Sequence, residues 1–258
     1  MSQNDPENQA NEMLDQIIKQ IQNNEITELN IPDGIKELKK CQFAGYPITS
    51  VKIPDTITKL PESVFAGCTS LKKVICSQNL TYIGNSAFFQ CNELVEFEIP
   101  DSVIKIDGGA FRSCTKLNIK IPPNIKCIGN CAFYDCLSLK EVKIPESCEE
   151  IGGSSFFNCI SLEVLELSPS LKSIPGTCFR QCSSLKSVII PPSVESIGNN
   201  AFSHCSSLDH VEIPPSVKTM GEQSFAYCPL VKTFEIPYSL QYFGEYCFHP
   251  SFFKRVKK

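Results

Sequence analysis

Residues 190–213 read IPPSVESIGNNAFSHCSSLDHVEI, and this pattern recurs along almost the whole chain. The residue before the recurrent proline, or the equivalent residue, serves as the anchor of each unit. The anchors are Ile31, Ile53, Cys76, Ile99, Ile121, Ile144, Leu167, Ile190, Ile213 and Ile236. Successive anchors lie 22 or 23 residues apart, so we expect one elongated array of stacked units.

Two positions of the unit hardly vary. The twelfth residue after the anchor is always phenylalanine: Phe43, Phe65, Phe88, Phe111, Phe133, Phe156, Phe179, Phe202, Phe225 and Phe248. The fifteenth is usually cysteine: Cys68, Cys91, Cys114, Cys136, Cys159, Cys182, Cys205 and Cys228. A unit of this size cannot bury these side chains alone, so we expect each column to point inward and stack on its equivalent in the next coil.

A third column is rich in glycine. The eighth residue after the anchor is Gly84, Gly129, Gly152, Gly198, Gly221 or Gly244 in six units, and Pro61 and Pro175 replace it in two others. Glycine at a fixed position indicates either a positive φ angle or a close approach of two backbones.

The stretches SSLDHVEIP, TSLKKVICS and LSLKEVKIP share an LxxVxI skeleton. With the rest of the unit, IPxSVxxIGxxAFxxCxSLxxVxI, this resembles the BspA-like class of leucine-rich repeats over residues 26–250. The resemblance implies a right-handed leucine-rich repeat solenoid, shaped as a horseshoe or arc. Parallel strands formed by the LxxVxI stretches would line its concave face, and the GNNAFSHC stretch would return across the convex side. Members of the class are adhesion or binding proteins, which implies a binding role.

The two ends differ from the repeats. Residues 1–24 are expected to form a helical cap on residues 25–250, with Asp5 as the N-cap and Pro6 at the first helical position. Its apolar stripe is Leu14, Ile17, Ile18 and Ile21. The last units carry aromatic side chains that either close the final coil or form a subunit contact: Tyr242, Phe243, Tyr246, Phe248, Phe252 and Phe253. Residues 251–258 form a basic tail ending in KRVKK.

Composition excludes some classes of function. The net charge of −4 gives no basic face for nucleic acid, so we expect none as a partner. The first twenty residues are polar, and no run approaches the ~18 apolar residues of a membrane span. Eight of the fifteen cysteines follow the repeat period, which indicates reduced core thiols. We therefore expect no membrane insertion and a cytoplasmic location, with the cell surface as the alternative.

The sequence contains no pattern typical of an active site. The three histidines, His204, His210 and His249, show no catalytic spacing, and we expect neither an enzyme nor a cofactor. The spacings Cys127-x₃-Cys131 and Cys178-x₃-Cys182 loosely resemble zinc ligands. However, Cys178 and Cys182, like Cys136, fall in inward columns, so no metal site is expected. Cys127 falls in a polar column and is the candidate for an exposed, reactive thiol.

The outward residues of the concave strands are the candidate binding site. They are Lys52, Lys73, Glu96, Glu98, Lys120, Glu141, Lys143, Val164, Glu166, Ile189, His210, Glu212 and Glu235. Lysines predominate in the first half of this face and glutamates in the second. We predict a non-enzymatic protein–protein interaction scaffold with an unknown protein partner. Homo-oligomers could form through this face or the aromatic C-terminal end. The alternatives are a cell-surface adhesin and a thiol-based redox or metal sensor.

Overall fold

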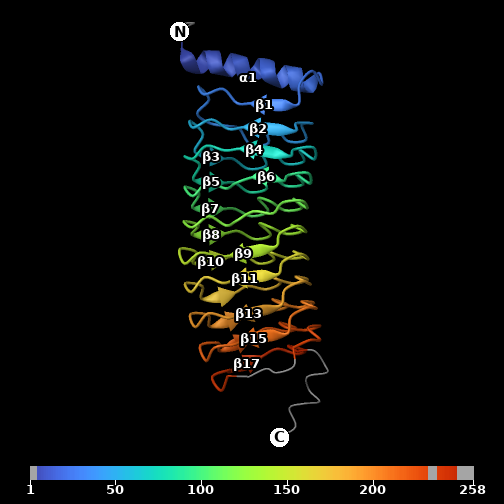
Figure 1. The fold of residues 1–258 in the computed structure, drawn as a ribbon. Coiled ribbons are helices and arrows are strands. Elements are labelled where there is room, and N and C mark those ends of the chain that lie inside the picture. The colour runs from blue at the N-terminus through green and yellow to red at the C-terminus, as the bar shows by residue number, and fades with distance from the viewer. Residues whose placement is uncertain (1–4, 232–236, 249–258) are drawn as a thin grey trace.

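The computed structural model describes residues 5–231 and 237–248, and it is a column of stacked coils covered at one end by a helix (Figure 1). The predicted parallel-strand solenoid is thus confirmed. Glu235, the aromatic residues Phe252 and Phe253, and the predicted tail 251–258 lie outside the described residues.

Helix α1 (Pro6–Gln22) lies across the first coil, as predicted (Figure 1). The Asp5 side chain accepts a hydrogen bond from the Glu7 N–H at 3.1 Å, which satisfies one of the free donors at the helix start. The helix buries Ala10, Leu14 and Ile21 against the first coil. It therefore covers core side chains that a further coil would otherwise cover.

One series of parallel strands comes from the LxxVxI stretches. These long strands are β1 (Glu28–Asn30), β2 (Ser50–Lys52), β4 (Lys73–Ile75), β6 (Glu96–Phe97), β9 (Glu141–Lys143), β11 (Val164–Glu166), β13 (Ser187–Ile189) and β15 (His210–Glu212). Equivalent residues of neighbouring coils are partners, as in the register Leu29, Val51, Val74. Each middle residue is buried and its neighbours point outward, as strand alternation requires.

A second series of strands was not predicted. These short strands are β3 (Lys59–Leu60), β5 (Tyr82–Ile83), β7 (Lys105–Ile106), β8 (Cys127–Ile128), β10 (Glu150–Ile151), β12 (Ser173–Ile174), β14 (Ser196–Ile197), β16 (Thr219–Met220) and β17 (Tyr242–Phe243). They also pair in parallel, in two sheets, and Figure 1 shows β3, β5, β7, β8 and β10 as a row beside the long strands. Two residues are too few to show an alternating pattern, so periodicity does not predict these strands.

The long-strand series is interrupted between β6 and β9. The coil after Ile99 is one residue short, and the missing residue falls between buried Leu117 and buried Ile119, where the strand would begin. No strand is assigned there, and the Asn118 side chain instead accepts a hydrogen bond from the Lys140 N–H at 3.2 Å. The short strands β7 and β8 pair across the same position, so the column itself continues.

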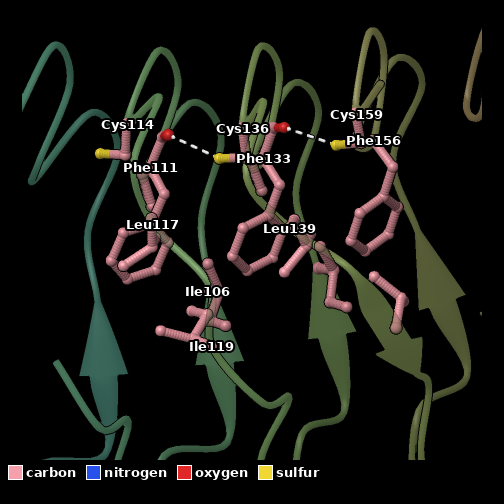
Figure 2. Close-up of a cluster of buried hydrophobic side chains, with 14 of the residues drawn as sticks. Ile106, Phe111, Cys114, Leu117, Ile119, Phe133, Cys136, Leu139, Phe156 and Cys159 are labelled. Atoms are coloured by element: carbon pink, nitrogen blue, oxygen red, sulfur yellow. Dashed lines mark hydrogen bonds between the residues drawn. The ribbon is translucent and has the colours of Figure 1, made fainter. Parts of the chain in front are cut away.

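The phenylalanine column forms a ladder of stacked rings. From Phe43 to Phe225 the centroids of successive rings lie 5.0 to 5.5 Å apart, with interplanar angles of at most 20°. Figure 2 shows Phe111, Phe133 and Phe156 in equivalent positions of successive coils. Offset stacking at this spacing adds to the burial of large apolar rings, and each ring is buried only because its neighbour covers it.

The cysteine column is buried beside the rings, and it also forms hydrogen bonds. Each thiol contacts the backbone carbonyl of the phenylalanine in the preceding coil, as Cys136 does with Phe111 at 3.2 Å and Cys159 with Phe133 at 3.3 Å (Figure 2). Cysteine is small enough for this crowded position and still offers a weak donor there.

The structure shows whether the glycine column is needed for positive φ angles or for close approach of two backbones. None of these six glycines has a positive φ. A Cβ atom on Gly152 would lie 2.3 Å from the Asn130 nitrogen, and one on Gly198 would lie 2.4 Å from the Gly176 nitrogen. The glycines are therefore needed for close backbone approach between coils.

Positive φ angles occur at two other columns, where most residues are not glycine. In the coil after Ile144, the two residues with a positive φ are Ser154 (φ 55) and Asn158 (φ 57). The N–H groups of these residues donate to Gly176 and Arg180 in the next coil, at 3.2 and 2.8 Å. The left-handed conformation thus allows the turn side of each coil to hydrogen-bond along the column, at some conformational cost for residues that carry a Cβ.

A pair of adjacent glycines tests the close-approach interpretation. Gly152→Ala should lower the free energy of unfolding by about 1–3 kcal/mol or more, because the new methyl group overlaps the backbone of the preceding coil. Gly153→Ala is the matched control, since its Cβ would meet nothing nearer than 3.5 Å. Urea unfolding of both variants measures the difference. Equal stability of the two variants would contradict the interpretation.

Candidate protein-binding face

The outward residues of the LxxVxI stretches, most of which lie on the long strands, follow one side of the column, which we call the long-strand face. All of the predicted site residues that the structure describes are exposed on it. On β11, for example, Val164 and Glu166 point outward on either side of buried Leu165. Strand alternation alone places these side chains outward. The residue types on this face can therefore differ from coil to coil, while those of the core columns stay constant.

Ion pairs neutralise much of the charge on this face. Lys73 pairs with Glu96 on the next coil at 2.8 Å. Lys143 pairs with Glu141 at 2.8 Å on its own strand and with Glu166 at 3.3 Å on the next coil. These carboxylates raise the pKa of Lys143, first through hydrogen bonds and then through their charge. Such exposed pairs add little to stability, but they leave fewer unpaired charges for a partner than the sequence suggests.

Two lysines of the face keep their charge unpaired. Lys52 and Lys120 are exposed, and neither forms an ion pair with any residue in the described part of the chain. The two halves of the face are also joined by the Lys143–Glu166 pair. The contrast between a basic and an acidic half, on which antiparallel self-pairing would depend, is therefore smaller than the order of residues indicated.

The second half of the face carries an apolar hollow. Ile189 is 61% exposed, and the hollow beside it measures about 590 Å³. Its lining residues are Ile189, Ile190, Pro192, His210, Val211, Glu212, Ile213 and Pro214. The His210 Nε2 and Glu212 Oε1 atoms lie 2.9 Å apart at its edge.

Part of this hollow was missed from the sequence. Ile189, His210 and Glu212 were predicted, but Pro192 and Pro214 were not. They belong to the turns that follow the strands, and only the paired prolines 191–192 and 214–215 distinguish these turns from most others. That signal could have directed attention there.

The thiols do not form a metal site. All fifteen cysteines are free, and no group of three metal-ligating side chains was found within residues 5–231 and 237–248. Cys127 is half-buried, and burial, followed by the charge of Glu150, raises its pKa. Cys41 is the exposed thiol, at a position that the repeat pattern did not single out. A raised pKa means less thiolate at neutral pH, which argues against Cys127 as the reactive residue.

Comparison with known proteins identifies the family. The model of the BspA type leucine-rich repeat region matches residues 19–118, 110–231 and 184–257. The chain belongs to this family. No curated protein matches this BspA type repeat chain.

Solved structures support the same assignment. A leucine-rich repeat protein from Bacteroides ovatus is 30% identical with a TM-score of 0.71, covering 86% of this chain. The alignment covers only 54% of that protein, so the BspA type chain spans about half its length. A leucine-rich repeat protein from T. pallidum is 26% identical with a TM-score of 0.50, covering 70% of this chain and 77% of that one.

No helix of sufficient length and apolar character to cross a bilayer occurs in the described part of this BspA type chain.

The buried thiols predict a loss of stability at alkaline pH. Burial raises the pKa of Cys68, Cys178 and Cys228 to about 12, against 9.0 for an exposed thiol. A raised pKa in the folded state gives stability that is complete below the unfolded pKa and is lost as the pH rises through the folded value. The free energy of unfolding should therefore fall from about pH 9 towards pH 12, by up to about 1.4 kcal/mol per pH unit for each buried thiol.

Denaturant titrations between pH 7 and pH 11 measure this slope. Cys136→Ala removes one buried thiol and should make the slope shallower, whereas Cys41→Ser removes an exposed thiol and should leave it unchanged. A stability that stays constant up to pH 11 would rule out burial of the column as neutral thiols.

Proposed function

We propose that this chain is a non-enzymatic scaffold that binds a protein partner through its long-strand face, with the hollow beside Ile189 as the main contact. The observation that carries the proposal is the exposure of an aliphatic side chain, 61% accessible, next to a hollow of about 590 Å³. Apolar surface of this kind, surrounded by polar residues, is typical of recognition sites.

The surroundings of Ile189 indicate the chemistry of the partner. In the register of the strands Ile189 faces Glu212 on the next coil, and Glu166 occupies the equivalent position of the preceding coil. Val164, 44% exposed, lies on the same preceding strand. A partner that places an apolar side chain in the hollow and basic side chains beside these carboxylates would be complementary.

The contact would be made by side chains. Among the long strands β9 pairs with β11 and β13 with β15, whereas β11 and β13 lie side by side without being paired in one sheet. Because these coils are adjacent, a partner strand has no room to insert between them and would contact the outward side chains instead. Affinity would then depend on a few outward side chains, with Ile189 the most exposed of the aliphatic ones there.

The described histidines have structural contacts, which supports a role without catalysis. His204 Nδ1 lies 2.8 Å from Ser203 Oγ, but Ser203 is fully buried, so no substrate could reach this hydroxyl. The His204 ring also packs on Tyr227 at 4.4 Å. His210 pairs with Glu212 on the exposed face.

Substitution of Ile189 tests the proposal. Ile189→Asp should reduce partner binding at least about tenfold, because a charge replaces the apolar contact. Ile104→Asp is the matched control: Ile104 is 49% exposed and directly precedes the short strand β7, on the other row of strands. Affinity capture from native lysate, followed by mass spectrometry, compares both variants with the parent chain.

The expected result is a protein retained by the parent chain and by Ile104→Asp, and lost with Ile189→Asp. Thermal unfolding should be similar for all three. If every captured protein is retained equally by the two variants, the long-strand face is not the binding surface.

A further inference from the structure

A second hollow, of about 570 Å³, lies on the short-strand side over β7 and β8. It forms where Gly108 and Gly109 lack side chains, while the preceding coil has Asn85 and Ser86 at the equivalent positions. A Cβ atom on Gly108 would lie 2.9 Å from the Asn85 Nδ2 atom. Any larger residue at position 108 would therefore occupy space next to this amide.

Arg112 lines the hollow and is held by two aromatic rings. Its guanidinium carbon lies 5.7 Å from the Phe89 ring centre and 4.8 Å from that of Tyr134, each on an adjacent coil. No carboxylate among residues 5–231 and 237–248 pairs with Arg112, and no side-chain hydrogen bond of Arg112 occurs there. The rings thus position a charged group whose N–H donors remain available.

The carboxylate nearest in sequence is already engaged. Asp107 accepts hydrogen bonds from the Tyr82 hydroxyl at 2.6 Å and from the Gly108 N–H at 3.0 Å, and the Lys105 ammonium lies 3.8 Å away. These donors, with Tyr82 foremost, lower the pKa of Asp107. Its negative charge is therefore compensated within the protein.

The amides add further donors. The Asn85 Oδ1 atom accepts a hydrogen bond from Ser86 Oγ at 2.9 Å, and Asn130 Oδ1 accepts one from the Gly153 N–H at 2.8 Å. Their NH₂ groups have no acceptor within the described residues. The Glu150 side chain accepts from the Cys127 thiol at 4.0 Å and forms no ion pair with any of the described residues. Unengaged donors therefore outnumber unengaged acceptors around the hollow.

We propose that this hollow binds the oxyanion of a small carboxylate or phosphate compound, with Arg112 as the principal ligand. The guanidinium fork would donate parallel hydrogen bonds to two anion oxygens, and the NH₂ groups of Asn85 and Asn130 would donate to the remaining lone pairs. Lys105 and Asp107 offset each other's charge, and Glu150 opposes the ligand. The site lies on the other row of strands from the hollow at Ile189 and does not depend on the partner proposed there.

Calorimetric titration with sodium succinate and with inorganic phosphate tests the site at constant ionic strength. At least one probe should bind saturably with a dissociation constant in the range of about 0.1–10 mM. A response to succinate alone identifies a carboxylate site, and a response to phosphate alone identifies a phosphate site. Absence of saturable binding by both would overturn the proposal.

Paired variants separate the site from general charge effects. Arg112→Gln should weaken binding at least about tenfold. Arg180→Gln is the matched control, because Arg180 stacks on Phe157 at 5.9 Å in the same column but does not line the hollow. Equal loss in both variants would show that binding depends on overall charge and contradict the site.

Glu150→Gln gives a readout that a purely structural role would not produce. Removal of this opposing carboxylate should strengthen anion binding about two- to fivefold. Unchanged or weaker binding in Glu150→Gln would show that this carboxylate does not face the bound anion, and it would contradict the placement of the ligand in this hollow.

Discussion

The stacking of each phenylalanine ring on its equivalent one coil away is the interaction on which the structure depends. Rings 5.0 to 5.5 Å apart, near the spacing of adjacent strands, keep the coils in a fixed register from Phe43 to Phe225. No coil can bury its own ring, so stability comes from contacts between neighbours. Helix α1 is needed for the same reason, because the first coil has no preceding coil to cover it.

The coil spacing explains most of the other constant positions. Backbones approach so closely at the glycine column that a Cβ atom cannot fit, and residues such as Ser154 adopt positive φ so that their N–H groups donate along the column. The thiols fill the remaining space and contact a carbonyl of the preceding coil. Outward side chains are not subject to these packing constraints. The residues of the long-strand face and of the hollow at Arg112 are therefore free to serve in binding.

The regular parts of the fold could be predicted from sequence, and the irregular parts could not. Inward Phe133 and Cys136 and the outward Val164 and Glu166 follow from periodicity, and the Asp5 cap follows from an aspartate placed directly before Pro6. The short strands have too few residues for a pattern, and the pairing of Lys143 with both Glu141 and Glu166 depends on side-chain conformation. The hollow at Gly108 becomes visible only once the coils are stacked, because its walls come from several units.

Coupling between adjacent rings tests the account most directly. Phe133 and Phe156 stack at 5.3 Å, whereas Phe202 lies three coils beyond Phe133. A double-mutant cycle of Phe133→Leu and Phe156→Leu, measured by denaturant unfolding, should give an interaction energy of about 0.5–1.5 kcal/mol. The cycle of Phe133→Leu and Phe202→Leu should give a value within about 0.5 kcal/mol of zero. Equal interaction energies for the two pairs, or none for the adjacent pair, would contradict stabilisation by ring-on-ring contact between neighbouring coils.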